Sequence, residues 1–285
     1  MTLRPRRSLL YMPGSNPRAI AKARSLPCDG VILDLEDAVA AEAKAEARAL
    51  VTAAVREGGF GGREVVVRIN APDTAWGADD IAALAGAGAD ALLVPKVSAP
   101  GDLAPVQAAL GAGSPVRIWA MMETPRAMLD AGAIAAAARG SCPGLSVLVM
   151  GTNDLAKDSR AQPGPARAHF LPWLMTCLAA ARAEGLDILD GVWNALDDAA
   201  GLATECAQGR ALGMDGKTLI HPGQIEICNR AFSPTTEEIA WAEKVVAAFA
   251  KPENRSLGAL RLEGRMVERL HAEMARRTLA LAAAI

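Results

Sequence analysis

The chain has 285 residues, and its 30 Lys and Arg against 32 Asp and Glu leave a formal net charge of −2. This balance excludes the broad positive surface that attracts nucleic acids or anionic membranes, so we expect neither as a partner. Hydrophobic residues make up 51% of the chain but aromatic residues only 4%, which predicts a core of Ala, Leu, Val and Ile. No apolar run approaches the roughly 20 residues of a membrane-spanning helix.

The N-terminus and the cysteines together predict a cytoplasmic protein. Residues 1–10 are basic but pass directly into a strand-like segment, without the hydrophobic region of a signal peptide. The five cysteines are scattered and show no CxxC spacing. This pattern is typical of reduced, buried thiols.

Short β-rich runs alternate with longer helical stretches along the chain. The predicted strands are Ser8–Pro13, Val31–Glu36, Glu64–Asn70, Ala91–Val97, Arg117–Glu123, Ser146–Gly151, Asp187–Val192 and Lys217–Pro222. The stretches between them are long enough for helices, as in Ala38–Arg56 and Leu171–Glu184. Strands that alternate with helices pair in parallel, so we predict an α/β fold, a (β/α)8 TIM barrel.

Two further helices are predicted after the last strand, over Thr236–Ala250 and Glu263–Ala283. No linker composition divides the chain. We therefore predict one domain, in which residues 1–232 form the barrel and residues 233–285 form a helical extension that acts as a lid. Gly258 and Gly264 would give this lid a flexible entry. Packing or an oligomer contact is the alternative role for the extension.

Ionisable residues follow the predicted strands, at the rim where such barrels carry their active sites. The strand ends are Asp34-Leu35-Glu36-Asp37, Arg68-Ile69-Asn70, Pro95-Lys96, Glu123-Thr124 and Gly151-Thr152-Asn153-Asp154. The end of the seventh strand, Gly191-Val192-Trp193-Asn194, is bland. Residues two apart share a strand face, so Glu36, Arg68, Asn70 and Glu123 should point into the barrel mouth. Asp37 and Asp154 follow just beyond, although a helix cap is the alternative for Asp37.

Acids gathered in one mouth, with only Arg68 and Lys96 as nearby cations, would repel one another without a further positive charge. Oxygen ligands without a His or Cys cluster favour Mg²⁺ or Mn²⁺ over Zn²⁺. We expect Glu123 and Asp154 to bind the metal directly, and Glu36 and Asp37 to hold its waters. A charge-balanced rim without metal is the alternative.

The strand-end motifs also carry a family resemblance. They are Arg7-Ser8-Leu9-Leu10-Tyr11-Met12-Pro13-Gly14-Ser15, Asp34-Leu35-Glu36-Asp37-Ala38-Val39, Val67-Arg68-Ile69-Asn70, Leu93-Val94-Pro95-Lys96-Val97, Met122-Glu123-Thr124-Pro125, Gly151-Thr152-Asn153-Asp154-Leu155 and Ile220-His221-Pro222-Gly223-Gln224. Each motif is weak alone, but in this order they resemble the citrate lyase beta-subunit and malyl-CoA lyase family of the HpcH/HpaI aldolase superfamily. The resemblance runs from about residue 6 to about residue 284.

The resemblance implies a ligand set and a quaternary structure. Mg²⁺ would bind to Glu123 and Asp154, Arg68 would bind the reacting carbonyl, and the chain would form a homo-oligomer, a trimer or hexamer. Coenzyme A, as part of the substrate, would lie across the rim. The further residues expected to bind substrate or coenzyme A are Pro13, Gly14, Ser15, Arg18, Lys22, Lys96, Gly151, Thr152 and Asn153. Without the resemblance, Arg18 and Lys22 are solvated helix charges.

One C-terminal string departs from the family pattern. The lyases carry Gly-x-Met-Ile-Asp in a segment that covers a neighbouring subunit's site and supplies an Asp as acid or base. The matching string here is Gly264-Arg265-Met266-Val267-Glu268, whose carboxylate is one methylene longer and resembles the malyl-CoA thioesterase branch. We place Glu268 on a helix that would dock against protein through its apolar positions Met266, Val267, Leu270 and Met274. A surface carboxylate is the alternative.

The predicted function is that of a Mg²⁺-dependent acyl-CoA lyase. It would cleave or form a (S)-malyl-CoA-like ester, giving acetyl-CoA plus glyoxylate or a related oxoacid. Its catalytic residues would be Arg68, Glu268, Glu36 and Asp37. The alternatives are a (S)-malyl-CoA thioesterase at the same site, a CoA-independent class II pyruvate aldolase, a citrate lyase beta subunit of a complex, and a Schiff-base aldolase that uses Lys96.

Overall fold

The structure, a computed structural model, describes residues 4–285. The described chain forms two compact units, one of Arg6–Ala231 and one that contains Phe232–Ile285. Within this described range, every helix is too short or too polar to cross a membrane.

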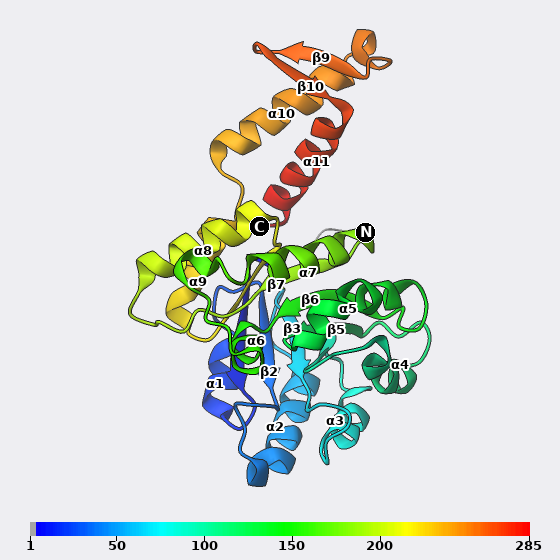
Figure 1. The fold of residues 1–285 in the computed structure, drawn as a ribbon, viewed down its shortest axis with the longest axis vertical. Helices are drawn as coiled ribbons and strands as arrows, with labels where there is room; N and C mark the ends of the chain where they lie inside the picture. The colour runs from blue at the N-terminus through cyan, green and yellow to red at the C-terminus, as the bar shows by residue number, and fades with distance from the viewer. Residues whose placement is uncertain (1–3) are drawn as a thin grey trace. The chain divides into compact units, whose positions relative to one another are not determined.

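Eight parallel strands close into a barrel in the first unit, as predicted (Figure 1). The strands are β1 (Ser8–Pro13), β2 (Gly30–Asp34), β3 (Glu64–Arg68), β4 (Ala91–Val94), β5 (Arg117–Met122), β6 (Leu145–Met150), β7 (Asp187–Asp190) and β8 (Gly216–Leu219). Each strand bonds to the next, and β8 bonds to β1.

Most strands end earlier than predicted, because side-chain carboxylates take the backbone N–H groups that would continue the ladder. The N–H of Glu36 donates to Asp34 at 2.9 Å, that of Asn70 to Asp80 at 2.9 Å, and that of Lys96 to Glu123 at 2.7 Å. At the rim, hydrogen bonds between carboxylate side chains and backbone N–H groups therefore replace the strand pairing.

Helices surround the strands on the outside of the barrel (Figure 1). They are α1 (Pro17–Ala23), α2 (Lys44–Glu57), α3 (Gly77–Leu84), α4 (Ala104–Leu110), α5 (Pro125–Ala136), α6 (Thr152–Ser159), α7 (Leu171–Ala183), α8 (Ala199–Leu212) and α9 (Ile225–Phe232). Short 3-10 turns lie at Ala41–Ala43, Pro100–Leu103, Ala137–Arg139, Pro165–Arg167 and Pro222–Gln224. The predicted helix over Ala38–Arg56 is therefore a 3-10 turn followed by α2.

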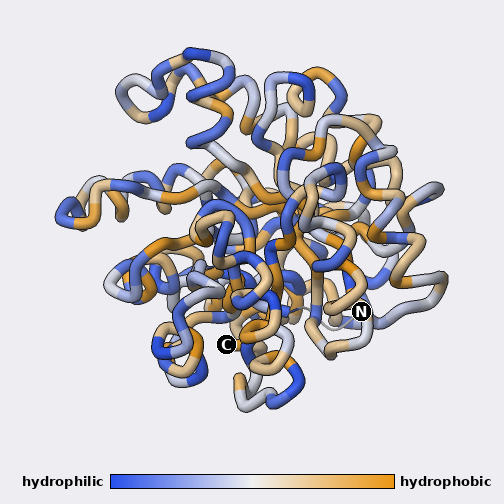
Figure 2. The backbone as a smooth tube through the Cα atoms, turned by 90° about the horizontal axis from the view of Figure 1, so that it is seen from below, coloured by the Kyte–Doolittle hydropathy of each residue, from blue (hydrophilic) through white to orange (hydrophobic). Residues whose placement is uncertain are grey.

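The barrel interior is apolar between two polar ends. Alternate strand residues point inward and form one buried cluster: Leu9, Ile32, Val66, Ala91, Leu93, Trp119, Met121, Val147, Val149 and Leu189. Orange, hydrophobic segments accordingly run through the middle of the view in Figure 2. At the N-terminal end, Arg6 binds Glu64 through two 2.7 Å hydrogen bonds and also pairs with Asp187. This ion cluster closes the barrel opposite the predicted site.

The second unit is a helical hairpin capped by a β-hairpin. Helices α10 (Thr236–Ala250) and α11 (Arg269–Ala284) are joined by a 3-10 turn (Pro252–Asn254) and by the antiparallel strands β9 (Ala259–Leu262) and β10 (Arg265–Glu268). Its buried core contains Ala242, Val245, Phe249, Val267, Ala272 and Ala275.

The predicted helix over Glu263–Ala283 is wrong in its first turns. Glu263 and Gly264 both have positive φ angles, 46° and 81°, which suits a two-residue turn between antiparallel strands. Val267 in β10 is buried, whereas Met266 is 72% exposed, which is the alternation of a strand. Glu268 ends that strand. Of the four apolar positions expected to dock against protein, Val267 is buried in the described chain, whereas Met266, Leu270 and Met274 are exposed.

Candidate functional site

Arg68 is the centre of the polar cluster in the barrel mouth. It lies at the end of β3 with its Cα in register with Asp34 on β2. Its Nε and Nη2 donate to the two carboxylate oxygens of Asp34, both at 2.7 Å. Its Nη1 lies 2.7 Å from Oε2 of Glu36 and 3.5 Å from Asp37. The acids predicted at the end of strand two therefore meet the predicted arginine.

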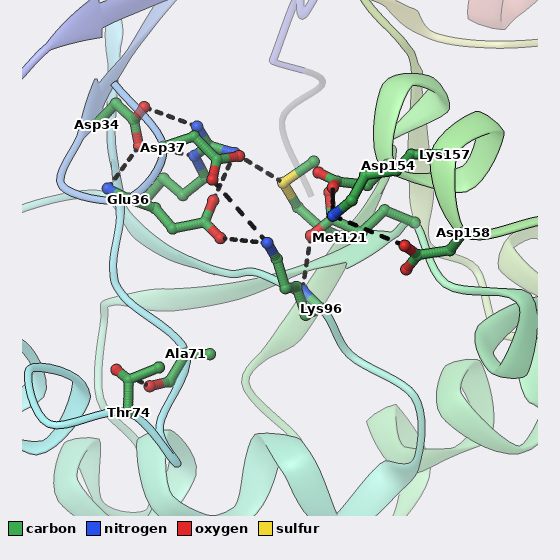
Figure 3. A network of polar contacts seen from close by, with 12 residues as sticks. Asp34, Glu36, Asp37, Ala71, Thr74, Lys96, Met121, Asp154, Lys157 and Asp158 are labelled. Carbon is green, nitrogen blue, oxygen red and sulfur yellow. Dashed lines mark hydrogen bonds and ion pairs between the residues drawn. The ribbon is translucent and has the colours of Figure 1, made fainter. Parts of the chain in front are cut away.

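Glu36 is the more weakly held of the two main partners of Arg68. Its buried Oε2 forms the 2.7 Å ion pair with Nη1 of Arg68 but accepts no hydrogen bond, whereas Asp34 accepts two hydrogen bonds from the same guanidinium. Its Oε1 lies 3.1 Å from Nζ of Lys96. Burial raises the pKa of Glu36, and the nearby charge of Asp37 raises it further, while Arg68 and Lys96 oppose both effects. Figure 3 shows Glu36 and Asp37 pointing toward Lys96.

Lys96 is held as a cation in this site. Burial lowers its pKa, but the charge and hydrogen bond of Glu36 and the charges of Asp37 and Asp154 outweigh burial, so the net shift is upward. A lysine that attacks a carbonyl must be neutral, and a raised pKa works against this. The surroundings of Lys96 thus disfavour the Schiff-base alternative.

Glu123 is a buried carboxylate with one free oxygen. It follows β5, is 1% exposed, and accepts the backbone N–H of Lys96 at Oε1. Its Oε2 accepts no hydrogen bond from residues 4–285. Burial raises the pKa of Glu123 to about 7, helped by the charges of Glu36 and Asp154. The charge of Arg68 lowers this pKa, but burial outweighs it.

The space beside Glu123 depends on Gly151. A Cβ atom at this position would lie 2.4 Å from Cβ and 2.5 Å from Oε2 of Glu123. Gly151 precedes α6, whose first turn carries Asp154, a side chain that is 22% exposed. Asp154 pairs with Lys157 at 3.7 Å, and in Figure 3 it lies beyond Met121 from Glu36 and Asp37.

These residues fit a magnesium ion. The donors are carboxylate oxygens, Oε2 of Glu123 accepts no hydrogen bond from residues 4–285, and Gly151 leaves space beside it. Within the described residues no three His, Cys, Asp or Glu side chains form a metal-holding group. Two carboxylates suffice for Mg²⁺, which usually keeps several waters. Glu123 and Asp154 would hold the ion.

Asn70 and Asn153 form hydrogen bonds outside the cluster around Arg68. Asn70 does not join the acids around Arg68, since its side-chain amide donates to Asp80 of α3 at 2.6 Å. We expected no functional contact from the end of strand seven. In the structure, however, Asn194 donates to Asn153 at 2.7 Å and so links the β7 loop to α6. Thr152 packs against Gly191 on that same loop.

The turn after β1 lies beside β2. The N–H of Gly14 donates to the carbonyl of Asp34 at 2.8 Å, so Pro13 and Ser15 are carried to the end of β2. Ser15, Arg18 and Lys22 are all exposed. They are therefore accessible to a ligand, as the predicted coenzyme A contact requires.

Glu268 lies in the second unit, between β10 and α11, where its backbone N–H donates to Nδ1 of His271 at 2.9 Å. Its side chain is half-buried. The proposed role of Glu268 in the barrel mouth stays a prediction.

Three supporting residues had no predicted role in the site. Asp34 has a sequence signal, because it shares a strand face with Glu36. Tyr11, the single tyrosine of the chain, shares a face with Leu9 and lies with its ring 5.0 Å from the guanidinium carbon of Arg68. Lys44 has no such signal: its Nζ donates to the carbonyls of Leu35 and Glu36 at 2.8 and 2.7 Å. A lysine in a helix is normally expected at the protein surface.

Similar proteins carry related names. The model of the HpcH/HpaI aldolase/citrate lyase family matches residues 7–222, and that of the C-C bond lyases of the TIM-barrel fold matches residues 166–285. A (3S)-malyl-CoA thioesterase of Cereibacter sphaeroides is 49% identical over 281 residues, covering 99% of this chain and 96% of that protein. The citrate lyase beta subunit of Escherichia coli is 31% identical, covering 93% and 89%.

Solved structures agree with this relationship. CitE from Mycobacterium tuberculosis in complex with magnesium, acetoacetate and coenzyme A superposes with a TM-score of 0.80 and 31% identity, covering 99% of this chain and 100% of that one. A citrate lyase beta subunit of the same organism, complexed with oxaloacetate and magnesium, gives a TM-score of 0.70 and 32% identity over 82% of this chain and 100% of that one. The chain therefore belongs to the HpcH/HpaI aldolase/citrate lyase family.

Proposed function

We propose that this chain is a Mg²⁺-dependent thioesterase that hydrolyses (3S)-malyl-CoA or a closely similar hydroxyacyl-CoA. The observation that carries the proposal is the 49% identity to a (3S)-malyl-CoA thioesterase over 99% of the chain, together with the carboxylate and arginine cluster in the mouth. From the sequence motifs we predicted the lyase first and the thioesterase as an alternative. Because the similarity to the thioesterase extends over nearly the whole chain, we now favour hydrolysis over carbon–carbon cleavage.

In this proposal, different residues of the barrel mouth bind the malyl group and polarise the reacting carbonyl. When bound at Glu123 and Asp154, Mg²⁺ (or Mn²⁺) supplies positive charge for the hydroxyl and carboxylate oxygens of the malyl group. Arg68 donates to the reacting carbonyl and stabilises the charge that develops on its oxygen. The backbone amides of Gly151, Thr152 and Asn153, at the start of α6, hold the substrate carboxylate.

The remaining rim residues bind coenzyme A in this proposal. The turn of Pro13, Gly14 and Ser15 contacts the carrier, and the exposed cations Arg18 and Lys22 pair with its phosphates. Glu36 and Asp37 face Nη1 of Arg68, and in this proposal Lys96 and Asp37 orient water or substrate hydroxyl groups.

Hydrolysis also needs a base for water, and we assign this role to Glu268. Residues 233–285 act as a lid in the proposal, and the chain is a homo-oligomer, a trimer or hexamer, in which the lid covers a neighbouring subunit's mouth. Glu268 then removes a proton from water as the water oxygen attacks the thioester carbonyl. When the carbon–sulfur bond breaks, Glu268 returns this proton to the departing sulfur of coenzyme A.

Cleavage of the carbon–carbon bond is the second candidate, favoured by the 31% identity to citrate lyase beta subunits. The same Mg²⁺ and Arg68 contacts would then serve an acetyl-CoA enolate. The two reactions differ in their products, because hydrolysis consumes water and gives malate and coenzyme A, whereas cleavage gives glyoxylate and acetyl-CoA.

The test is incubation of the purified chain with Mg²⁺ and (S)-malyl-CoA, with separate measurement of free thiol, malate, glyoxylate and acetyl-CoA. We expect thiol and malate in equal amounts and no glyoxylate. Glyoxylate in equal amount to acetyl-CoA would establish the lyase instead. No product from the free ester, but activity with partner subunits, would favour a citrate lyase component.

A further inference from the structure

The two carboxylates that contact Arg68 are held in different ways. Asp34 is 1% exposed and accepts four hydrogen bonds: two from Arg68, one from the N–H of Glu36 at 2.9 Å and one from the N–H of Ala38 at 3.1 Å. It is the last residue of β2, and its Cα pairs with that of Arg68 in the sheet register. The Asp34–Arg68 pair is therefore built into the barrel.

Glu36 makes fewer contacts with Arg68 than Asp34 does, and it also lies beside a second cation, Lys96. It lies beyond the end of β2, its Oε2 has no hydrogen bond, and its Oε1 lies 3.1 Å from Nζ of Lys96. An incoming oxygen that takes the Nη1 group of Arg68 leaves Glu36 paired with Lys96. The same oxygen would have to replace both bonds from Arg68 to Asp34, and the buried Asp34 carboxylate would then lose its cation.

The flat face of the guanidinium is also covered. The ring of Tyr11 lies 5.0 Å from the guanidinium carbon, and its hydroxyl lies 3.7 Å from the sulfur of Met121. With Asp34 on the Nε–Nη2 edge and Tyr11 over one face, Nη1 of Arg68 is directed toward Glu36, Asp37 and, at 3.9 Å, the sulfur of Met121.

We propose that Asp34 is a positioning residue that fixes the direction of Arg68, and that Glu36 is the exchangeable counter-ion that yields the Nη1 group of Arg68 to a ligand oxygen. This inference rests on the proposed function in that Arg68 binds the reacting carbonyl. It assigns the two acids opposite effects: removing the charge of Asp34 weakens ligand binding, and removing that of Glu36 does not.

The test uses wild type, Asp34→Asn, Glu36→Gln, Arg68→Ala and the Asp34→Asn/Arg68→Ala double variant. Oxaloacetate binding in the presence of Mg²⁺ is measured by calorimetry, and (S)-malyl-CoA turnover is measured alongside. We expect Asp34→Asn to lower kcat by about 10²-fold, because a small misplacement of a catalytic group has effects of this size. It should also weaken oxaloacetate binding, whereas Glu36→Gln should bind oxaloacetate as tightly as wild type or more tightly.

The double variant separates positioning from structure. If Asp34 acts only through Arg68, Asp34→Asn should change oxaloacetate binding by less than about twofold in the Arg68→Ala background. The matched control is Asp29→Asn at the opposite end of the barrel. Asp29 likewise accepts a backbone N–H and two guanidinium bonds, from Arg7, at 2.7 to 2.9 Å. Its loss should lower thermal stability without changing ligand binding.

Several outcomes overturn the proposal. These are an Asp34→Asn variant with unchanged kcat and binding, an equal loss in the Arg68→Ala background, and equal weakening by Glu36→Gln and Asp34→Asn. If Asp34→Asn does not fold, Asp34→Glu should still weaken binding by moving the guanidinium. Oxaloacetate binding without malyl-CoA turnover would contradict the thioesterase and leave the binding comparison decisive. No oxaloacetate binding by wild type would contradict the role of Arg68 itself.

Discussion

Glu123 is ionised at a cost in free energy, because it is 1% exposed and one backbone N–H is its only hydrogen-bond donor within residues 4–285. Asp34, equally buried, accepts four hydrogen bonds. We propose that the same chemical group binds a metal ion at Glu123, whereas at Asp34 it binds an arginine. The difference follows from the number of donors that surround each carboxylate.

Removing the charge of either proposed ligand should abolish metal binding. We expect Glu123→Gln and Asp154→Asn to lose turnover and Mg²⁺ affinity while they keep the far-UV circular dichroism spectrum and melting temperature of a folded chain. The control is Asp158→Asn, one turn along α6, whose carboxylate pairs with Lys157 at 3.8 Å. Full activity of Glu123→Gln in chelator-treated buffer would remove the metal assignment.

Mg²⁺ affinity should depend on pH through Glu123. Its pKa is raised to about 7, so below that pH the metal must displace a proton, and affinity falls as the pH falls. We expect a decrease of up to about tenfold per pH unit below about 7, and little change above it. Calorimetry in buffers of different ionisation enthalpy measures the proton released. An affinity that stays constant between about pH 6 and 8 would contradict this coupling.

Arg68 should not be replaceable by lysine. A lysine carries the same charge but cannot make the two parallel bonds to Asp34, so it would be held in a different place. We expect Arg68→Lys to lower kcat by more than about tenfold, or ~1.4 kcal/mol of transition-state stabilisation. Steady-state kinetics with (S)-malyl-CoA measure this. A smaller loss would mean that Arg68 only balances the charge of the acids.

The sequence was most informative where a site residue lies at a strand end. Glu36, Arg68 and Glu123 could be predicted together, because two-residue periodicity and the barrel geometry place them at one rim. Lys44 could not be predicted, since its contact with the carbonyls of Leu35 and Glu36 depends on tertiary packing of α2. Asn70 was misassigned because its partner, Asp80, lies on a separate helix.

At the scale of elements, the turn from β6 into α6 positions Glu123 as well as Asp154. Gly151 allows this turn to approach β5 closely. We expect Gly151→Ala to displace Glu123, to weaken Mg²⁺ binding and to lower kcat/KM by about 10²-fold. Gly132→Ala in α5 is the matched control, since a Cβ there meets nothing within 4 Å. Equal Mg²⁺ affinities of the two variants would contradict the role of the turn.

The eight strands were predictable in number and order because alternation of strand and helix leaves few alternatives. The β9–β10 hairpin was not, because Arg265-Met266-Val267-Glu268 has no strong helix or strand signal and its conformation is set by the Glu263-Gly264 turn and by burial of Val267. Local signals of this length cannot decide between a helix start and a short strand.

At the scale of the whole molecule, the proposed active site draws on both compact units. The barrel unit contains Arg68 and the proposed metal ligands, and the second unit contains Glu268. If Glu268 is the base, Glu268→Gln should lower kcat by about 10²–10⁴-fold with little change in KM. Glu273→Gln, an exposed acid on α11, is the control and should remain active.

Mixing two inactive variants tests whether the site is shared between subunits. In a homo-oligomer with a shared site, a Glu268→Gln subunit supplies an intact mouth and a Glu123→Gln subunit supplies an intact Glu268, so mixed oligomers regain some complete sites. We expect activity to return after subunit exchange, which native mass spectrometry of differently tagged chains verifies. Each variant exchanged with itself is the control. Verified mixed oligomers without activity would show that Glu268 does not act across subunits, and an active Glu268→Gln variant would remove the residue from the mechanism.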